Sequence, residues 1–372
     1  IASSILECND PNDYQLMEQQ QQNDDNDNDE ARILAYTSTH KDDVVIMDVE
    51  PGGSMEYLRH FCVVDHKQKA LVLAVRGTFS LSGLVTDLVG FCEPFCGGQA
   101  HCGMAEMAKA TWDKAQHAVL AKLQTLPQDY DLVITGHSLG AGVACLLTVL
   151  LYHQNAITTG HKVRCLAYAP PPVFSPLHAA ADAVNATVAY IHNHDVVPFL
   201  SVHNVRKFFE MVLALDEKTK HMSMYEKILI DWDFRKPTTE MIEALRTAQT
   251  KPMKQLRGAD QVGIPAKAII WLREATEGET AAVKARNTNN QDDNAPKSFQ
   301  QLDSEITRVN YIACVCDSRK VMNLSILINT FMITDHLTSK YENALRHALM
   351  EDDLMNTTGT ITQNPIQKKK DN

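Results

Sequence analysis

The segment that most restricts the fold of this chain is residues 131–152, where a short apolar run, a tight turn and a long apolar stretch follow one another. The run DLVIT at 131–135 has the length and composition of a buried strand, and the stretch from Leu139 to about Tyr152 has the length of a helix. The turn between them is Gly136-His137-Ser138-Leu139-Gly140. A strand that passes into a helix through such a turn is typical of α/β domains, whose strands are covered on both faces.

Apolar runs and helical patterns alternate on both sides of this segment. Further strands are predicted at FCVVD from Phe61, ALVLAV at 70–75, 164–168, 187–192 and, near the end, 326–333. Between the early strands, apolar residues recur at helical spacing from Met104 to Leu126. The alternation predicts an α/β fold: a mainly parallel sheet with right-handed crossovers and helices on both faces.

The length of 372 residues, with 44% hydrophobic residues, allows one large domain with a sizeable core. We predict an acidic disordered tail over 1–30, a single domain over 31–356, and a second disordered tail over 357–372. An insertion over 205–306 is predicted to be helical at first, and its polar second half from 277 lacks periodicity.

The charge of the chain is concentrated in its first thirty residues. The formal net charge is −11, and residues 1–30 hold nine acidic and no basic side chains, so the remainder is close to neutral. A neutral body has no basic surface for phosphate backbones, and nucleic acid is therefore not an expected partner.

The nine cysteines form an odd set, which favours a reducing compartment. Their spacing matches no structural zinc site, so we expect no metal there. No cofactor is expected either. The acidic run at 18–30 matches no ordered calcium loop, and stimulation by calcium is left open. No signal peptide and no apolar run of about 18 residues is visible.

Ser138 at the centre of the turn is the strongest candidate for chemistry. A serine hydroxyl is a weak nucleophile until a positioned base takes its proton, so the hypothesis requires a histidine and an acid. Gly136 and Gly140 let the backbone pack closely, and His137 is expected to line an acyl pocket. The alternative is a small-residue turn with no chemistry.

Asp195 is the favoured acid because it follows the predicted strand at 187–192 and precedes Pro198, which stops further pairing. The alternative is a turn-forming aspartate. Among fifteen histidines, His192 and His194 are too close to Asp195 along the chain to pair with it. His336 follows the last predicted strand and is the favoured base, with a helix-cap neighbour as the alternative.

The oxyanion of an acyl-transfer intermediate needs preorganised donors. The backbone N–H of Leu139 is one candidate. Thr78 is the other, because it stands in the loop Arg76-Gly77-Thr78-Phe79-Ser80 directly after a predicted strand. An ordinary polar turn is the alternative for this loop.

The chain resembles the class 3 lipases, and among them the sn-1-specific diacylglycerol lipases. The resemblance is carried by an ordered series of segments: VRGTFS, TDL at 86–88, HCGM at 101–104, VITGHSLGAGVA, CLAYAPPPVFSP, HNHDVVPFLS and TDHLTSKY. It implies an α/β-hydrolase fold with Ser138 as nucleophile, Asp195 as acid, His336 as base, and Thr78 with Leu139 as the oxyanion hole. It also implies action on acylglycerols at a membrane surface. Together with the reducing compartment that the cysteines favour, this leads us to expect a cytoplasmic protein peripheral at a membrane surface.

Residues 81–100 occupy the place of the family's lid, with Gly97-Gly98 as a candidate hinge. A loop packed on the core is the alternative. The membrane domain usual at the N-terminus of the animal enzymes is missing from these residues. Because the chain begins with Ile1 rather than Met, a fragment with an upstream membrane domain is compatible with the sequence.

The expected function is a serine esterase that cleaves a fatty acyl ester of a glycerolipid, diacylglycerol at sn-1, through an acyl-enzyme. The nearest alternative is a phospholipase A1 or galactolipase. The alternative from another class is a catalytically silent hydrolase-like scaffold.

Overall fold

The computed structural model describes residues 33–34, 37, 39–48, 58–77, 91–221, 238–250, 262–274, 311–317, 321, 331–332 and 334–346. The two predicted tails, 1–30 and 357–372, lie outside these residues. So do the whole polar second half of the insertion, 277–306, and residues 78–90.

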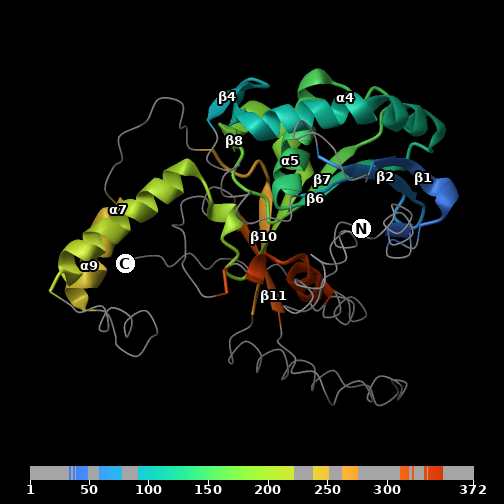
Figure 1. Ribbon diagram of the computed structural model, residues 1–372. Helices are drawn as coiled ribbons and strands as arrows, with labels where there is room; N and C mark the ends of the chain where they lie inside the picture. The colour runs from blue at the N-terminus through green and yellow to red at the C-terminus, as the bar shows by residue number, and fades with distance from the viewer. Residues whose placement is uncertain are drawn as a thin grey trace, which may run out of the picture.

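An eight-stranded sheet forms the centre of the molecule, in the order β1-β2-β3-β6-β7-β9-β10-β11 (Figure 1). Its five middle strands, from β3 to β10, run parallel, while β1, β2 and β11 pair antiparallel at the two edges. The strands are β1 (Val44–Asp48), β2 (His60–Asp65), β3 (Ala70–Val75), β6 (Asp131–His137), β7 (Val163–Tyr168), β9 (Thr187–His192), β10 (Ala268–Glu274) and β11 (Tyr311–Asp317).

Helices α4 (Cys102–Thr125) and α5 (Leu139–Gln154) cover one face of the sheet, as Figure 1 shows. α5 lies on β3, β6 and β7, and α4 packs on α5 through the apolar stripe that its sequence predicts, from Met104 to Leu123. α6 (Ala181–Ala186) is a shorter helix beside them. Short 3-10 turns stand at η2 (Lys41–Asp43), η3 (Leu177–Ala180), η4 (Val197–Phe199) and η6 (Thr334–His336).

The other face of the sheet is also buried. In β3, Leu71, Leu73 and Val75 belong to the core cluster under α4 and α5, whereas Ala70 and Val72 belong to a second cluster with Ile33. The helical residues 338–346 pack Tyr341 and Ala344 against β10 and β11. The predicted α/β-hydrolase architecture, a mainly parallel sheet with helices on both faces, is confirmed.

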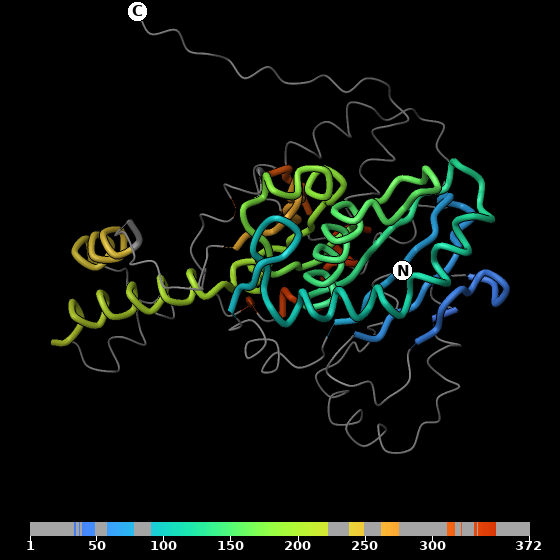
Figure 2. Tube along the Cα trace, turned by 90° about the horizontal axis from the view of Figure 1, so that it is seen from above, coloured from blue at the N-terminus to red at the C-terminus, as the bar shows by residue number. Residues whose placement is uncertain are grey.

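The insertion predicted over 205–306 contains a strand of the main sheet, which corrects that boundary. β10 pairs parallel with β9 from Ala268↔Val188 to Leu272↔His192. The prediction missed it because its apolar run AIIWLRE stands between charged and polar flanks that dominate the local composition. Two helices do stand in this segment: α7 (Val202–Thr219) and α9 (Thr239–Thr250) pack on each other away from the sheet (Figure 2).

The strand predicted at 326–333 lies almost entirely outside the described residues, and residues 331–332 form a turn. The last described strand is instead β11, which begins at Tyr311. Within the predicted lid segment, residues 81–90 are outside the described residues. Cys96 and Gly97 form the turn of a hairpin between β4 (Cys92–Phe95) and β5, whose first residue is Gly98 (Gly98–His101), and β8 (Phe174–Ser175) joins it as a third strand. None of the described helices is long and apolar enough to span a membrane.

Gly140 fixes how closely α5 approaches the sheet. A Cβ built there would collide with the carbonyl oxygen of Val75 and stand 2.8 Å from the carbonyl carbon of Arg76. These are backbone atoms at the end of β3, which cannot rotate away as a side chain can. The first turn of α5 therefore packs directly on the end of β3 because position 140 has no side chain.

We predict that Gly140→Ala lowers the free energy of unfolding by about 1–3 kcal/mol, because the added methyl group forces the helix and the strand apart. Gly103→Ala in α4 is the matched control, since its nearest neighbour outside the helix backbone would be at 3.9 Å. Denaturant titration measures both variants. Equal stability of Gly140→Ala and wild type would contradict this account of the packing.

Candidate active site

The turn between β6 and α5 holds Ser138 in a conformation that side chains rarely adopt. Its φ of 58° and ψ of −126° lie in the positive-φ region, which costs about 1–3 kcal/mol for a residue other than glycine. The Ser138 N–H donates to the carbonyl of Tyr168 at 2.9 Å, and its carbonyl accepts from the N–H groups of Ala141 and Gly142. These bonds hold the turn, and Ser138 as a residue is only 3% exposed at the carboxyl end of β6.

Ser138, His336 and Asp195 are brought together from three distant parts of the chain. The Nε2 atom of His336 is 2.8 Å from the hydroxyl oxygen of Ser138, and its Nδ1 atom is 3.0 Å from both carboxylate oxygens of Asp195. Asp195 follows β9 and is completely buried, while His336 ends the 3-10 turn η6. An Nδ1–H that donates to the carboxylate leaves Nε2 free to accept the serine proton.

The buried Asp195 carboxylate receives two further hydrogen bonds. The N–H of Val197 donates to Oδ1 at 2.9 Å, and the hydroxyl of Tyr341 donates to Oδ2 at 2.6 Å. The Tyr341 oxygen in turn accepts from the N–H of His192 at 3.0 Å. Burial, together with the Asp195 charge, raises the pKa of Tyr341 well above its usual value, so its hydroxyl stays protonated and remains a donor.

Tyr341 is the residue of this site that the sequence interpretation missed. It ends the segment TDHLTSKY, five residues after His336, which is not the three- or four-residue spacing that places two side chains on one face of a helix. No local pattern therefore reveals its contact with Asp195, which is 146 residues away along the chain.

His137 is buried against the base. Its ring centroid is 4.7 Å from that of His336 and 5.6 Å from that of Tyr341. Its Nε2 has no hydrogen-bond partner among the described residues. Burial, and then the nearby His336, hold the pKa of His137 well below its usual value, so its ring is neutral where it packs against His336. The predicted contact with an acyl chain stays a prediction.

Leu139 opens α5, so its N–H is one of the donors that a helix leaves without an intrahelical partner. It stands next to Ser138, where an oxyanion could accept from it. The second predicted donor, Thr78, lies outside the described residues. Gly77, the last described residue before it, is adjacent to the turn: a Cβ on it would be 3.6 Å from the Cβ of Ser138.

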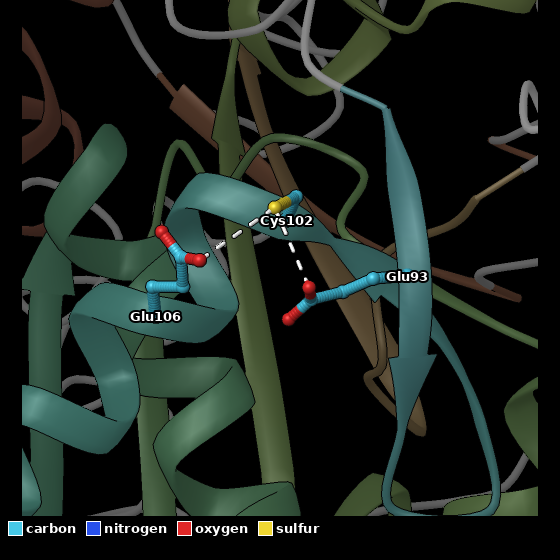
Figure 3. A group of neighbouring side chains, drawn as sticks. All are labelled: Glu93, Cys102 and Glu106. Atoms are coloured by element: carbon cyan, nitrogen blue, oxygen red, sulfur yellow. Dashed lines mark hydrogen bonds between the residues drawn. The ribbon is translucent and has the colours of Figure 1, made fainter.

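One cluster of potential metal ligands is present in the described part of the chain, at Glu93, Cys102 and Glu106 (Figure 3). The Cys102 thiol donates to Glu93 at 3.4 Å and approaches Glu106 at 4.0 Å, while Lys109 lies 3.5 Å from Glu93. Burial and the two carboxylates raise the pKa of Cys102, so its sulfur is a protonated thiol that can donate to Glu93. Hydrogen bonds and the Lys109 charge account for this cluster.

A mainly parallel sheet with a serine at a strand-to-helix turn, and a histidine and an aspartate beside it, defines the α/β-hydrolase class. Within that class, residues 72–205 match the model of the family described as lipase (class 3). The resemblance to class 3 lipases noted in the sequence is therefore confirmed for this part of the chain.

Individual relatives align with a similar part of the chain. Diacylglycerol lipase-beta of Mus musculus is 33% identical over 160 residues, which are 41% of this chain and 23% of the relative. Diacylglycerol lipase-alpha of Homo sapiens is 30% identical over 174 residues, which are 43% of this chain and 16% of the relative. The secreted mono- and diacylglycerol lipase A of Penicillium cyclopium is 29% identical over 150 residues, which are 38% of this chain and 46% of the relative.

The chain spans less than a quarter of the mammalian relatives. Among solved structures, the lipase from Rhizopus microsporus var. chinensis matches at 20% identity with a TM-score of 0.41, covering 47% of this chain and 61% of that one.

We predict that Tyr341→Phe lowers the free energy of unfolding by about 1–3 kcal/mol, because the buried Asp195 carboxylate loses a donor that nothing replaces. Tyr152→Phe is a comparison variant, since it loses a hydrogen bond of 3.0 Å to the neutral carbonyl of Val163. Its loss should be smaller, about 0.5–1.5 kcal/mol. Thermal or urea unfolding at neutral pH measures both, and a smaller loss for Tyr341→Phe than for Tyr152→Phe would speak against the carboxylate contact.

The lowered pKa of His137 predicts a loss of stability in acid. As the pH falls below about 6.5, an unfolded histidine takes up a proton that the buried one refuses. The free energy of unfolding therefore drops by up to about 1.4 kcal/mol per pH unit for this group. In His137→Gln this slope between pH 6.5 and 5 should be shallower by up to that amount. An unchanged slope would show that position 137 does not contribute.

Proposed function

We propose that this chain is a serine hydrolase that cleaves a fatty acyl ester of a glycerolipid. The observation that supports the proposal most strongly is the pair of contacts of His336, 2.8 Å to the Ser138 hydroxyl and 3.0 Å to the Asp195 carboxylate. A serine, a histidine and an aspartate hydrogen-bonded in this order make the serine hydroxyl nucleophilic at neutral pH.

In the proposed first half-reaction, Nε2 of His336 takes the proton of Ser138 while the serine oxygen attacks the ester carbonyl. The oxyanion of the tetrahedral intermediate accepts from the N–H of Leu139 and, as the sequence predicts, from Thr78. His336 then gives its proton to the leaving alcohol, which departs as the glycerol part of the lipid. The fatty acid stays bound to Ser138 as an ester.

In the second half-reaction, His336 takes a proton from water, and the oxygen of that water attacks the acyl-enzyme. Collapse of the second intermediate releases the fatty acid and returns the proton to Ser138. Asp195 stabilises the imidazolium that forms in each half. These steps draw on no metal or cofactor.

The substrate class is proposed from the relatives and from the surface beside the base. The matched relatives are named for mono- and diacylglycerols. On this chain, Leu337 directly follows His336 and is 40% exposed, and Phe331 is 62% exposed nearby along the chain. Apolar side chains next to a reacting histidine suit a substrate with acyl chains. We therefore propose diacylglycerol, cleaved at sn-1, as the substrate, met at a membrane surface.

Replacing the nucleophile tests the mechanism. We predict that Ser138→Ala abolishes covalent labelling by a fluorophosphonate probe and lowers ester hydrolysis by about 10⁴-fold or more, since no acyl-enzyme can form. Ser201→Ala is the control, because Ser201 is also buried but caps helix α7 by accepting from Asn204. Equal labelling of wild type and Ser138→Ala, or labelling of neither, would favour a catalytically silent scaffold.

Head-group preference tests the substrate. We predict that, in mixed micelles with matched acyl chains, diacylglycerol is hydrolysed faster than phosphatidylcholine or a galactolipid, with release of the sn-1 chain. The reason is that the proposed site recognises an ester between apolar side chains rather than a large polar head group. Faster release from a phospholipid would instead assign a phospholipase A1, and faster release from a galactolipid a galactolipase.

A further inference from the structure

A second buried carboxylate lies beside the candidate triad and takes no part in its proton transfers. Asp335 directly precedes His336, and its side chain is 9% exposed. A carboxylate removed from water is destabilising unless it is paired or hydrogen-bonded, so its partners reveal what it holds.

Those partners all lie just before Asp195. Oδ2 of Asp335 accepts from the backbone N–H of His194 at 3.2 Å and lies 3.6 Å from the Nδ1 atom of the same residue. Its Oδ1 atom is 3.7 Å from Nδ1 of His192. Asp335, the residue before the candidate base, therefore accepts a hydrogen bond from His194, the residue before the candidate acid. This bond stands one residue before the contact between His336 and Asp195 in both segments.

His192 adds a second link between the same two segments. It is fully buried, and burial lowers its pKa despite the Asp335 charge, so the ring is neutral. Its Nδ1 is 3.1 Å from the carbonyl oxygen of Asp335, and its Nε2 is 3.1 Å from the hydroxyl of Tyr311. One tautomer satisfies both contacts: Nδ1–H donates to the Asp335 carbonyl, and Nε2 accepts from Tyr311.

The turn that carries His336 needs such links because it is short. η6 has three residues and two local backbone hydrogen bonds. The N–H of Asp335 donates to the carbonyl of Phe331, and the N–H of Leu337 donates to the carbonyl of Thr334. Neither bond connects the turn to the segment that bears Asp195. The N–H of Val196 does donate to the carbonyl of Met332 at 3.4 Å, but that bond reaches only the residues before the turn. A displacement of a catalytic group by about 1 Å can lower a rate by about 10²-fold, so the cross-links govern whether His336 reaches both partners.

We propose that Asp335 is a positioning residue for the candidate base: by accepting from the His194 N–H, its carboxylate holds His336 within reach of Ser138 and Asp195. This inference rests on the proposed serine-hydrolase function. It requires an acceptor atom at this position, not a proton transfer.

Two substitutions that keep the branched shape and the number of side-chain heavy atoms separate the acceptor from the packing. The amide oxygen of Asp335→Asn can still accept from His194, whereas Asp335→Leu has no acceptor. We expect Asp335→Leu to lower kcat for a soluble short-chain ester at least tenfold with KM changed less than threefold, and Asp335→Asn to retain kcat within about threefold of wild type. Asp129→Ala is the control, because Asp129 pairs with Lys69 at the surface in the turn before β6, at the opposite strand end from Ser138.

Rates are taken per active site titrated with a fluorophosphonate, and melting temperatures are recorded, so unfolded protein does not count as slow enzyme. Wild-type kcat per titrated site in Asp335→Leu would overturn the proposal and leave Asp335 a purely stabilising residue. Equal losses in the Asn and Leu variants would overturn it as well, because an acceptor alone would not restore the geometry. If Asp335→Leu does not fold, Asp335→Ala replaces it with the same expectations.

A proton spectrum keeps this inference distinct from the proposed function. The Nδ1–H of His336, hydrogen-bonded to Asp195, should give a low-field resonance in wild type and Asp335→Asn and lose it in Asp335→Leu, whether or not the protein hydrolyses esters. A wild type that neither labels nor hydrolyses contradicts the proposed function alone. A low-field resonance that persists unchanged in Asp335→Leu contradicts the positioning role alone.

Discussion

The arrangement of the site depends on keeping one carboxylate charge stable without water. Asp195 is completely buried, and an ionised carboxylate there is stable only if several donors meet it. They come from three places: the imidazole of His336, the hydroxyl of Tyr341 and the N–H of Val197. Because two of these donors belong to the last described segment of the chain, stabilising the Asp195 charge also joins that segment to the end of β9.

The sheet makes this convergence available. β3, β6 and β9 are parallel strands of one sheet, so the segments that follow them all start at the same end of the sheet, where the carboxyl ends of these strands lie. The turn at Ser138, the loop after Val75 and the turn at Asp195 meet there. The strained backbone of Ser138 is held by hydrogen bonds to Tyr168 and to the first turn of α5. These bonds offset the cost of the strain at the same end of the sheet.

Much of this could be predicted from short segments. The strand at 131–135, the turn at Ser138 and the helix after it were predictable because each local pattern agrees with its tertiary environment. β10 was missed because an apolar run between charged flanks resembles a helical insertion when its pairing with the predicted strand at 187–192 is unknown. The contribution of Tyr341 was hidden for a similar reason, since a contact across 146 residues leaves no periodic signal.

The sequence by itself determined where strands turn into helices, because that change depends on residues close together in the chain. It also determined which reactive residue types stand at those turns. It therefore singled out Ser138, Asp195 and His336 as candidates. Only the tertiary structure decided their distances, the neutral state of buried His137 and the second link through Asp335. Those properties depend on exclusion of water and on contacts between segments far apart in the chain, which appear only when the sheet brings its strand ends together.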